Sequence, residues 1–306
     1  MTATWGKGAG HRRTIRMPYA GSRRHFRIRA RDTVLDLGSR TLIMGILNVT
    51  PDSFSDGGAF FETARAVERA WRIAEEGADI LDVGGESTRP GSQGVSAEEE
   101  LRRILPVLEA LMEKYPLPVS IDTSKSEVGR AALERGAVLV NDITAFGKDP
   151  ALGEAVSSFG AGVILMHMRG EPGTMQKLPP SPDILGEIEE WAGRVSDRAQ
   201  ALGVARDRII LDPGIGFGKT VSQNLQIILN LDRLAAAGFP VLVGTSRKSF
   251  IGRILSDPAA DRIWGSAAAV AASILSGAHM VRVHDVAAMR DVARVTDALL
   301  SERVSE

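Results

Sequence analysis

Residues 42–48 read LIMGILN, an almost continuous apolar run that ends in one polar side chain. Such a run is typical of a strand that is covered on both faces, as the strands of parallel sheets are. The first strand is therefore predicted at 42–47. Seven similar runs follow, and they predict further buried strands at 80–83, 118–121, 138–140, 163–166, 209–211, 241–243 and 280–283.

The segments between these runs have the spacing of amphipathic helices. Val67, Ala70, Trp71 and Ala74 would form one buried stripe, and 101–108 has the same pattern. Six of the seven helix-to-strand passages carry a glycine, which can adopt the left-handed conformation at a helix end: Gly77, Gly136, Gly160, Gly203, Gly238 and Gly277. Strands and helices therefore alternate throughout.

Eight such units without a long break predict an α/β fold, a (β/α)8 TIM barrel rather than an open doubly wound sheet. Residues 25–37 alternate polar and apolar around Arg31-Asp32, which predicts a short N-terminal hairpin before the first barrel strand, at the bottom of the barrel. No linker separates a second domain. We expect a single domain over 26–306, preceded by an extension at 1–25.

The extension is strongly basic. The first 31 residues hold nine Lys or Arg and no acid before Asp32. This composition superficially resembles a transit peptide, but Gly and Pro interrupt any amphipathic helix, so a flexible basic extension is favoured.

The rest of the composition is that of an ordinary globular protein, 44% apolar and 25% charged with a net charge of −1. It indicates neither nucleic acid nor membrane as a partner, and the longest small-apolar stretch, 266–278, is shorter than the ~20 residues of a membrane span. The chain has no cysteine, which excludes disulfides, thiolate metal sites and cysteine nucleophiles, and suits a cytoplasmic location.

Polar residues follow every predicted strand. A parallel barrel brings the carboxyl ends of its strands to one rim, where loops assemble a site. Taken singly, Asp122 could cap a helix, Asn141 could complete a turn and Lys248 could be solvated. Together these residues predict a pocket for a planar polar heterocycle beside an anion. They are Asn48, the polar loop 84–91, Asp122, Asn141, His167, Asp212, Ser246, Lys248, Arg282 and His284.

Long motifs at this rim resemble those of the dihydropteroate synthases. They are NVTPDSFSDGG at 48–58, GGESTRPG at 84–91, DPGIGFGK at 212–219, SRKS at 246–249 and RVHDV at 282–286. The likeness covers roughly residues 40–300 in the family's order and is far more specific than a lone glycine motif. It implies the condensation of 6-hydroxymethyl-7,8-dihydropterin pyrophosphate with p-aminobenzoate, assisted by Mg²⁺ and proceeding through a pterin-methyl cation.

The resemblance implies a pterin site in which an ionised Asp212 accepts from two adjacent ring donors. Lys248 would face the ring carbonyl and N5, and Arg282 would stack on the ring. His167, between two methionines, is expected to line the pocket rather than transfer protons. The implied pterin-binding residues are Asp122, Asn141, Met166, Asp212, Gly216, Lys248 and Arg282.

The leaving pyrophosphate requires cationic partners. The resemblance implies Mg²⁺ held through Asn48, with hydrogen bonds from Arg282 and His284. Asp122 would stabilise the cation formed as pyrophosphate leaves. The implied pyrophosphate-binding residues are Asn48, Thr88, Arg89, Arg282 and His284, and the implied catalytic residues are Asp56, Asp122, Lys248, Arg282 and His284.

The aryl substrate would bind beside the first two loops. The implied p-aminobenzoate residues are Phe54, Thr88, Arg89, Pro90, Phe217, Ser246 and Lys248, where sulfonamide inhibitors should compete. Two rival functions remain open, a pterin-binding paralogue without turnover and a methyltetrahydrofolate:corrinoid methyltransferase. The family also implies a homodimer, which the alanine-rich segment 267–275 could permit, although that segment could equally be interior.

Overall fold

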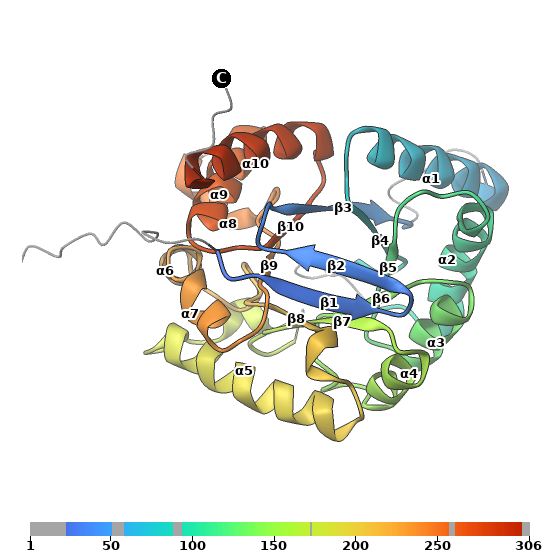
Figure 1. Cartoon of the computed structure of the whole chain (residues 1–306), viewed down its shortest axis with the longest axis horizontal. Helices are drawn as coiled ribbons and strands as arrows, with labels where there is room; N and C mark the ends of the chain where they lie inside the picture. Colours follow the sequence, from blue (N-terminus) through green and yellow to red (C-terminus); the bar gives the residue numbers. More distant parts are fainter. Residues whose placement is uncertain (1–22, 51–57, 88–93, 172, 257–260, 302–306) are drawn as a thin grey trace, which may run out of the picture.

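The computed structural model describes residues 23–50, 58–87, 94–171, 173–256 and 261–301 (Figure 1). The strands are β1 Phe26–Ala30, β2 Thr33–Leu37, β3 Leu42–Asn48, β4 Ile80–Gly84, β5 Val119–Asp122, β6 Leu139–Asp142, β7 Gly162–Met166, β8 Ile209–Asp212, β9 Leu242–Val243 and β10 Met280–Val283. The α-helices are α1 Gly58–Glu75, α2 Ala97–Met112, α3 Ser126–Glu134, α4 Ala151–Phe159, α5 Ile184–Ala201, α6 Val221–Ile228, α7 Leu231–Ala236, α8 Ser249–Leu255, α9 Ile263–Leu275 and α10 Val286–Ser301.

Strands β3 to β10 form one closed parallel barrel. Their order is β8-β7-β6-β5-β4-β3-β10-β9, and a parallel bridge between Leu211 and Val241 joins the two ends. Helices surround this barrel in Figure 1. The predicted (β/α)8 barrel is confirmed, and each strand bound lies within two residues of the expected one.

The six glycines expected at helix ends all adopt positive φ, from +61° at Gly160 to +106° at Gly136. The left-handed conformation lets each chain segment turn from its helix into the next strand. One detail of the helical stripes was wrong. Trp71 is 36% exposed and packs edge-on against Tyr115, while Ala66, Ala70 and Ile73 form the buried face of α1.

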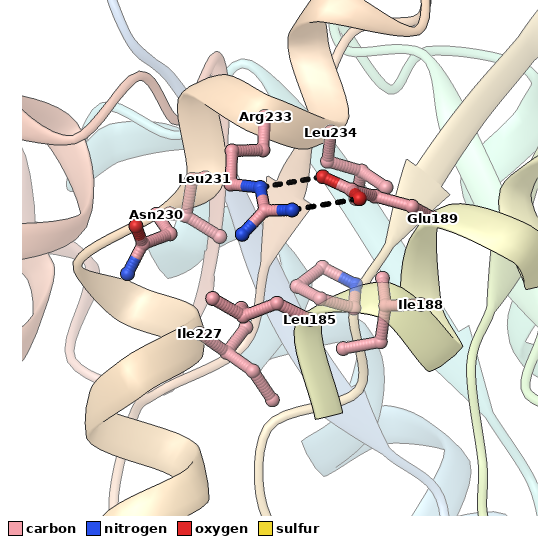
Figure 2. A pocket seen from close by; sticks show the side chains of 9 residues that line it. Leu185, Ile188, Glu189, Ile227, Asn230, Leu231, Arg233 and Leu234 are labelled. Atoms are coloured by element: carbon pink, nitrogen blue, oxygen red, sulfur yellow. Dashed lines mark hydrogen bonds and ion pairs between the residues drawn. The ribbon is translucent and has the colours of Figure 1, made fainter. Parts of the chain in front are cut away.

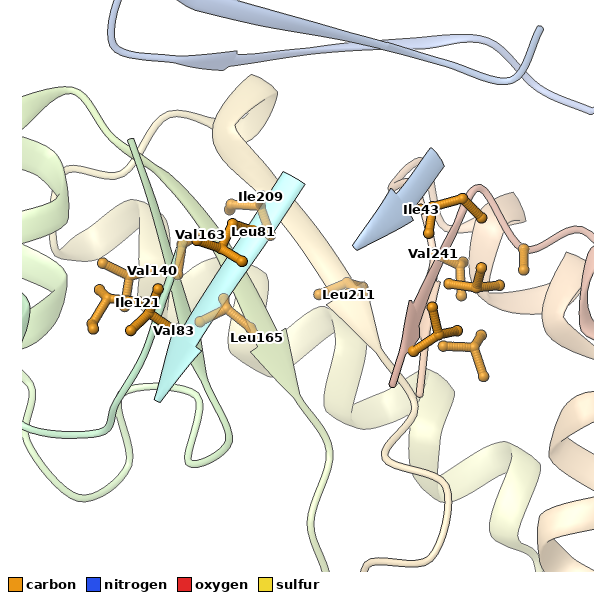
Figure 3. Packing of buried hydrophobic residues seen from close by; sticks show 14 of the residues in the cluster. Ile43, Leu81, Val83, Ile121, Val140, Val163, Leu165, Ile209, Leu211 and Val241 are labelled. Atoms are coloured by element: carbon orange, nitrogen blue, oxygen red, sulfur yellow. The ribbon is translucent and has the colours of Figure 1, made fainter. Parts of the chain in front are cut away.

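Successive side chains of a strand point to opposite faces, so each barrel strand serves two layers. The outer layer packs between strands and helices, and Figure 3 shows Leu81, Ile121, Val140 and Leu165 among it. The alternate positions line the interior. Near the amino ends of the strands these are apolar and include Met44, Ile80, Leu139, Ile164, Ile210 and Met280.

The hairpin β1–β2 covers this apolar lower layer. In Figure 1 it lies across the end of the barrel that faces the viewer. Its buried residues Ile28, Ala30, Leu35 and Leu37 belong to the same hydrophobic cluster as the inward side chains. The predicted hairpin and its place at the bottom are therefore confirmed. Arg23, just before it, is buried and donates to Thr41 Oγ1 (2.6 Å) and the Ala278 carbonyl (2.9 Å).

Within the described ranges, no helix combines the length and the apolar character needed to cross a membrane. The predicted extension at 1–25 falls outside the described residues as far as residue 22.

Candidate active site at the carboxyl end of the barrel

The inward-facing positions change from apolar to polar toward the carboxyl ends of the strands. In β4 Ile80 is followed two residues later by Asp82, in β8 Ile210 by Asp212, and in β10 Met280 by Arg282. The same spacing places Asp122, Asn141 and Met166 at the inner ends of β5, β6 and β7. Register brings them together, because Asp122 pairs with Asn141 and Met166 with Asp212.

Arg282 lies between two carboxylates at the centre of this cluster. Its Nε donates to Asp82 Oδ2 at 2.6 Å, and its Nη2 donates to Asp122 Oδ2 at 2.7 Å. The Asp82 side chain is fully buried, and the Arg282 side chain is 19% exposed. A guanidinium has five N–H donors, so those not used by the carboxylates can still bind an anion.

Asp82 was missed in the sequence. It accepts hydrogen bonds from both Arg282 Nε and Asn141 Nδ2, the latter at 3.0 Å. A detectable signal existed, because a carboxylate inside an otherwise apolar strand must find partners in the interior. Asp142, by contrast, is structural. Its carboxylate accepts from the backbone amides of Thr144 and Phe146, at 2.8 Å and 2.7 Å.

The carboxyl group of Asp122 is hard to ionise in the free protein. Burial, more than any other influence, raises its pKa to about 7, and the nearby Asp82, Glu100 and Asp142 raise it further while Arg282 lowers it. A group with such a pKa near neutrality, inside a pocket, is a candidate for a chemical role.

Asp212 and Lys248 are two further groups of opposite charge in this cluster. Burial raises the pKa of Asp212, whereas the Gly214 amide, which donates to Oδ1 at 2.7 Å, and the Lys248 ammonium lower it. Burial also lowers the pKa of Lys248 to about 8, and Asp212 opposes this change. The Lys248 Nζ lies 4.1 Å from the centre of the Phe217 ring, a cation–π contact that places both on one wall.

The loop after β8 is shaped by alternating glycines. Gly214, Gly216 and Gly218 have φ of +67°, +85° and +68°, a region that L side chains rarely adopt. This conformation holds Phe217, which is 7% exposed, against Met166 and Met175. Gly216 lies beside Lys248, whose Cδ would be 3.4 Å from a Cβ at this position.

Ser246 and His284 are paired across the rim. Ser246 Oγ lies 3.1 Å from His284 Nδ1 and accepts from the His284 backbone amide at 3.3 Å. At this distance the hydroxyl can donate to an unprotonated Nδ1 or accept from a protonated one, depending on the ring tautomer. Burial, the largest influence, lowers the pKa of His284 to about 4, and Arg282 and Arg247 lower it further. His284 is thus a neutral N–H donor at pH 7.

A third charged group, which the sequence did not indicate, supports the start of the second loop. The ammonium of Lys125 contacts Glu86 and donates to the fully buried Glu100 at 2.5 Å. The residues expected beyond this point, Thr88, Arg89 and Pro90, lie outside the described residues. Asp56 and Phe54 of the first loop also lie outside them.

Asn48 is the last residue of β3 and pairs in register with Gly84. Its amide oxygen is a hard donor of the kind Mg²⁺ accepts, and Mg²⁺ commonly takes only one or two protein ligands beside substrate phosphates and water. In the described ranges no three His, Asp or Glu side chains lie close enough to hold a metal. A single amide oxygen of this kind fits an ion that takes its other ligands from a phosphate and water.

Two hollows lie away from this rim. A crevice of about 10 Å³ between α5 and α7 is lined by Leu185, Ile188, Leu231 and Leu234 and closed by the Arg233–Glu189 ion pair (Figure 2). It has room for about one water molecule. The other, of about 450 Å³, lies at the amino end of β3 between Arg40 and Arg290. Neither contains the charge cluster described above.

Comparison with known proteins agrees with this geometry. A family described as pterin binding enzymes matches residues 44–284. Fold and site together thus define the class, a pterin-binding enzyme built on a (β/α)8 barrel.

Individual relatives are similar over most of the chain. The dihydropteroate synthase of Synechocystis sp. is 48% identical over 268 residues, which is 87% of this chain and 93% of the relative. The Yersinia pestis dihydropteroate synthase, solved with a sulfonamide drug, has a TM-score of 0.84 at 42% identity, covering 90% of this chain and 100% of that one. The Xanthomonas albilineans dihydropteroate synthase with 4-aminobenzoic acid has a TM-score of 0.82 at 42% identity, covering 90% and 98%.

The chain belongs to the dihydropteroate synthase family. It is accordingly a transferase of folate biosynthesis, which condenses 6-hydroxymethyl-7,8-dihydropterin pyrophosphate with p-aminobenzoate.

The pKa of Asp122 predicts a pH dependence. Below about pH 7 the carboxyl group is protonated, and only its ionised form can stabilise a cation, so kcat/KM should rise with pH. We expect an increase of roughly tenfold between pH 5.5 and pH 7 in the wild-type enzyme. The Asp122→Asn variant should be slower and lack this rise. The substrate's own ionisation affects both proteins equally, so it cancels in the ratio of wild-type to variant kcat/KM. A variant profile as steep as that of the wild type would assign the titration to another group.

Proposed function

We propose that the charged rim carries out the condensation by stabilising charge, without a covalent enzyme intermediate. The C–O bond between the pterin methylene and the diphosphate breaks first, and its electron pair leaves with pyrophosphate. The amine of p-aminobenzoate then forms the new C–N bond and gives up a proton. The observation that supports this route is the arrangement of Asp82, Arg282 and Asp122, a cation between two anions at the bottom of the pocket.

The pterin ring is proposed to bind between β6, β8 and the loop after β8. Asp212 uses one oxygen for the Gly214 amide, so the remaining acceptor positions are available for two ring donors. Asn141, Met166 and Gly216 would border the ring. Lys248 has donors only and would face the ring carbonyl and N5.

Asp122 is proposed to lie next to the pterin's reduced-ring N–H. As the diphosphate leaves, positive charge spreads over the ring and favours the ionised carboxylate. The donors expected to receive the pyrophosphate are the free N–H groups of Arg282 and the Nε2–H of His284. Preorganised donors of this kind are worth on the order of 3 kcal/mol each in the transition state.

Mg²⁺, when bound through Asn48 and the diphosphate, would supply further neutralisation of the leaving group. Thr88, Arg89 and Asp56 are assigned to the same end of the substrate by resemblance alone. Their roles remain predictions.

The p-aminobenzoate slot is proposed beside Phe217 and Lys248, with Phe54, Thr88, Arg89 and Pro90 contributed by the loops. The relatives solved with 4-aminobenzoic acid and with a sulfonamide drug support both the substrate and competition by sulfonamides at this chain. Ser246 is 4% exposed and its hydroxyl contacts both the ring Nδ1 and the backbone amide of His284. It would therefore have to exchange partners to bind the aryl carboxylate.

The decisive assay follows release of pyrophosphate from 6-hydroxymethyl-7,8-dihydropterin pyrophosphate. We expect release to require both p-aminobenzoate and Mg²⁺, with 7,8-dihydropteroate as the second product. Binding without release would support the paralogue that lacks turnover. Methyl transfer from methyltetrahydrofolate would instead support the corrinoid methyltransferase.

Removal of the Asp212 carboxylate should abolish measurable pterin affinity. The Asp212→Ala variant leaves two ring donors without an acceptor in a buried pocket, which typically costs several kcal/mol. Calorimetric titration with the pterin pyrophosphate measures the effect. Asp183→Ala, which alters a cap at the start of α5, is the matched control and should bind normally. Equal affinity in both variants would contradict the assignment of Asp212.

We further propose a homodimer and, from the cysteine-free composition, a cytoplasmic location. Helices α8, α9 and α10 expose large apolar side chains that a monomer would leave in water, namely Ile254, Leu255, Trp264, Val295 and Leu299. Trp264 alone is 81% exposed. One face of α9 is buried through Ser266, Val270 and Ile274, while Ala268, one turn after Trp264, is exposed on the opposite side.

A charge introduced into this apolar surface by substitution should dissociate the proposed dimer. Sedimentation equilibrium is expected to give a dimer for the wild type and a monomer for Trp264→Glu, because a carboxylate cannot be buried there without a partner. Val34→Glu, on the exposed side of the hairpin, is the control and should stay dimeric. A monomeric wild type would rule out the proposal.

A further inference from the structure

Lys219 is a buried lysine for which the proposed mechanism has no role. It ends the loop that follows β8 and is 5% exposed. Its Nζ donates to three backbone carbonyls, those of His167 at 3.1 Å, Gly214 at 2.8 Å and Phe217 at 3.1 Å. An ammonium has three hydrogens for these three acceptors, whereas a neutral amine has two.

These bonds join two chain segments that meet directly. The carbonyl of His167 belongs to the loop after β7, and the other two belong to the loop after β8. A Cβ at Gly214 would overlap the His167 carbonyl, and one at Gly218 would overlap the carbonyl of Arg169. Arg169 returns a hydrogen bond from Nη1 to the Gly218 carbonyl at 3.2 Å. The wall that carries Phe217 is therefore held by cations behind it.

The charge of Lys219 also acts on Asp212. The ammonium lowers the pKa of Asp212, together with Lys248 and Arg282. The pKa of Lys219 is itself lowered to about 7. Burial is the largest cause, and Lys248 and Arg169 act in the same direction, while Asp212 and Glu187 oppose the change. Hydrogen bonds to three carbonyls favour the charged form as well.

We propose that Lys219 is a positioning residue that fixes the Phe217 wall through three carbonyls and, by its charge, keeps Asp212 able to accept hydrogen bonds from the pterin. This inference rests on the proposed role of Asp212. Lys219 itself does not touch the substrate.

Two variants distinguish the effect of the Lys219 charge from the effect of its hydrogen bonds to the three carbonyls. Lys219→Met removes the charge and all donors at similar length, and Lys219→Gln keeps two donors without charge. The Kd for 6-hydroxymethyl-7,8-dihydropterin pyrophosphate is measured by calorimetry at pH 6 and pH 8. For both variants, we expect the ratio of variant to wild-type Kd to be at least about fivefold larger at pH 6 than at pH 8. The reason is that Asp212 would become protonated at pH 6 in the variants, which lack the Lys219 charge.

A loss of affinity of the same size at both pH values would overturn the charge effect and leave a purely structural lysine. Unchanged affinity in the variants would overturn the whole proposal. Lys114→Met, an exposed lysine after α2, is the matched control and should behave as the wild type. Thermal denaturation first establishes that each variant is folded. If Lys219→Met does not fold, the test is made with Lys219→Gln alone.

A second readout requires neither turnover nor pterin. The ¹³C signal of the Asp212 carboxyl carbon, assigned with Asp212→Asn, is titrated in wild type and variant. We expect the pKa of Asp212 to rise by about one unit or more in either Lys219 variant. No rise would contradict the proposal. A rise in the variants, together with a wild type that does not bind the pterin pyrophosphate, would instead contradict the role of Asp212 in recognition. If neither variant folds, a wild-type Asp212 that titrates above pH 6 would overturn the inference.

Discussion

The ion pairs of Arg282 with Asp82 and Asp122 are the interaction on which this site depends. Each partner comes from a different strand, so the triad exists only when β4, β5 and β10 are in register within a closed barrel. Burying these charges is costly, and the cost is offset only while all three are present. In the proposed mechanism, the same arrangement would provide negative charge beside the reacting carbon and unused guanidinium donors toward the leaving group.

Most of the fold could be predicted because its signals are local. Continuous apolar runs gave the barrel strands, and glycines at helix ends gave the turns into them. The rim positions of Asp122, Asn141, Asp212 and Arg282 followed from topology, since parallel strands end together. Their roles came from resemblance to the family and remain predictions.

What the sequence did not indicate are the relations between side chains distant in the chain. Asp82 looked like part of an apolar run, although two later strands supply its partners. Ser246 looked like a ligand for the aryl carboxylate, and pairing with His284 depends on how β9 and β10 lie side by side. Trp71 fitted a helical stripe by spacing, but spacing does not say where the neighbouring helix ends.

The hairpin under the barrel has a consequence for the order of events. Its side chains fill the lower opening, so the pocket communicates with solvent at one end alone. In a pocket that is open at one end only, the ligand that lies deeper has to bind before the shallower one and cannot leave while the shallower one is bound. With the pterin in the proposed deeper position, the floor would favour a compulsory sequence in which the pterin binds before the arylamine and the joined product leaves as a unit.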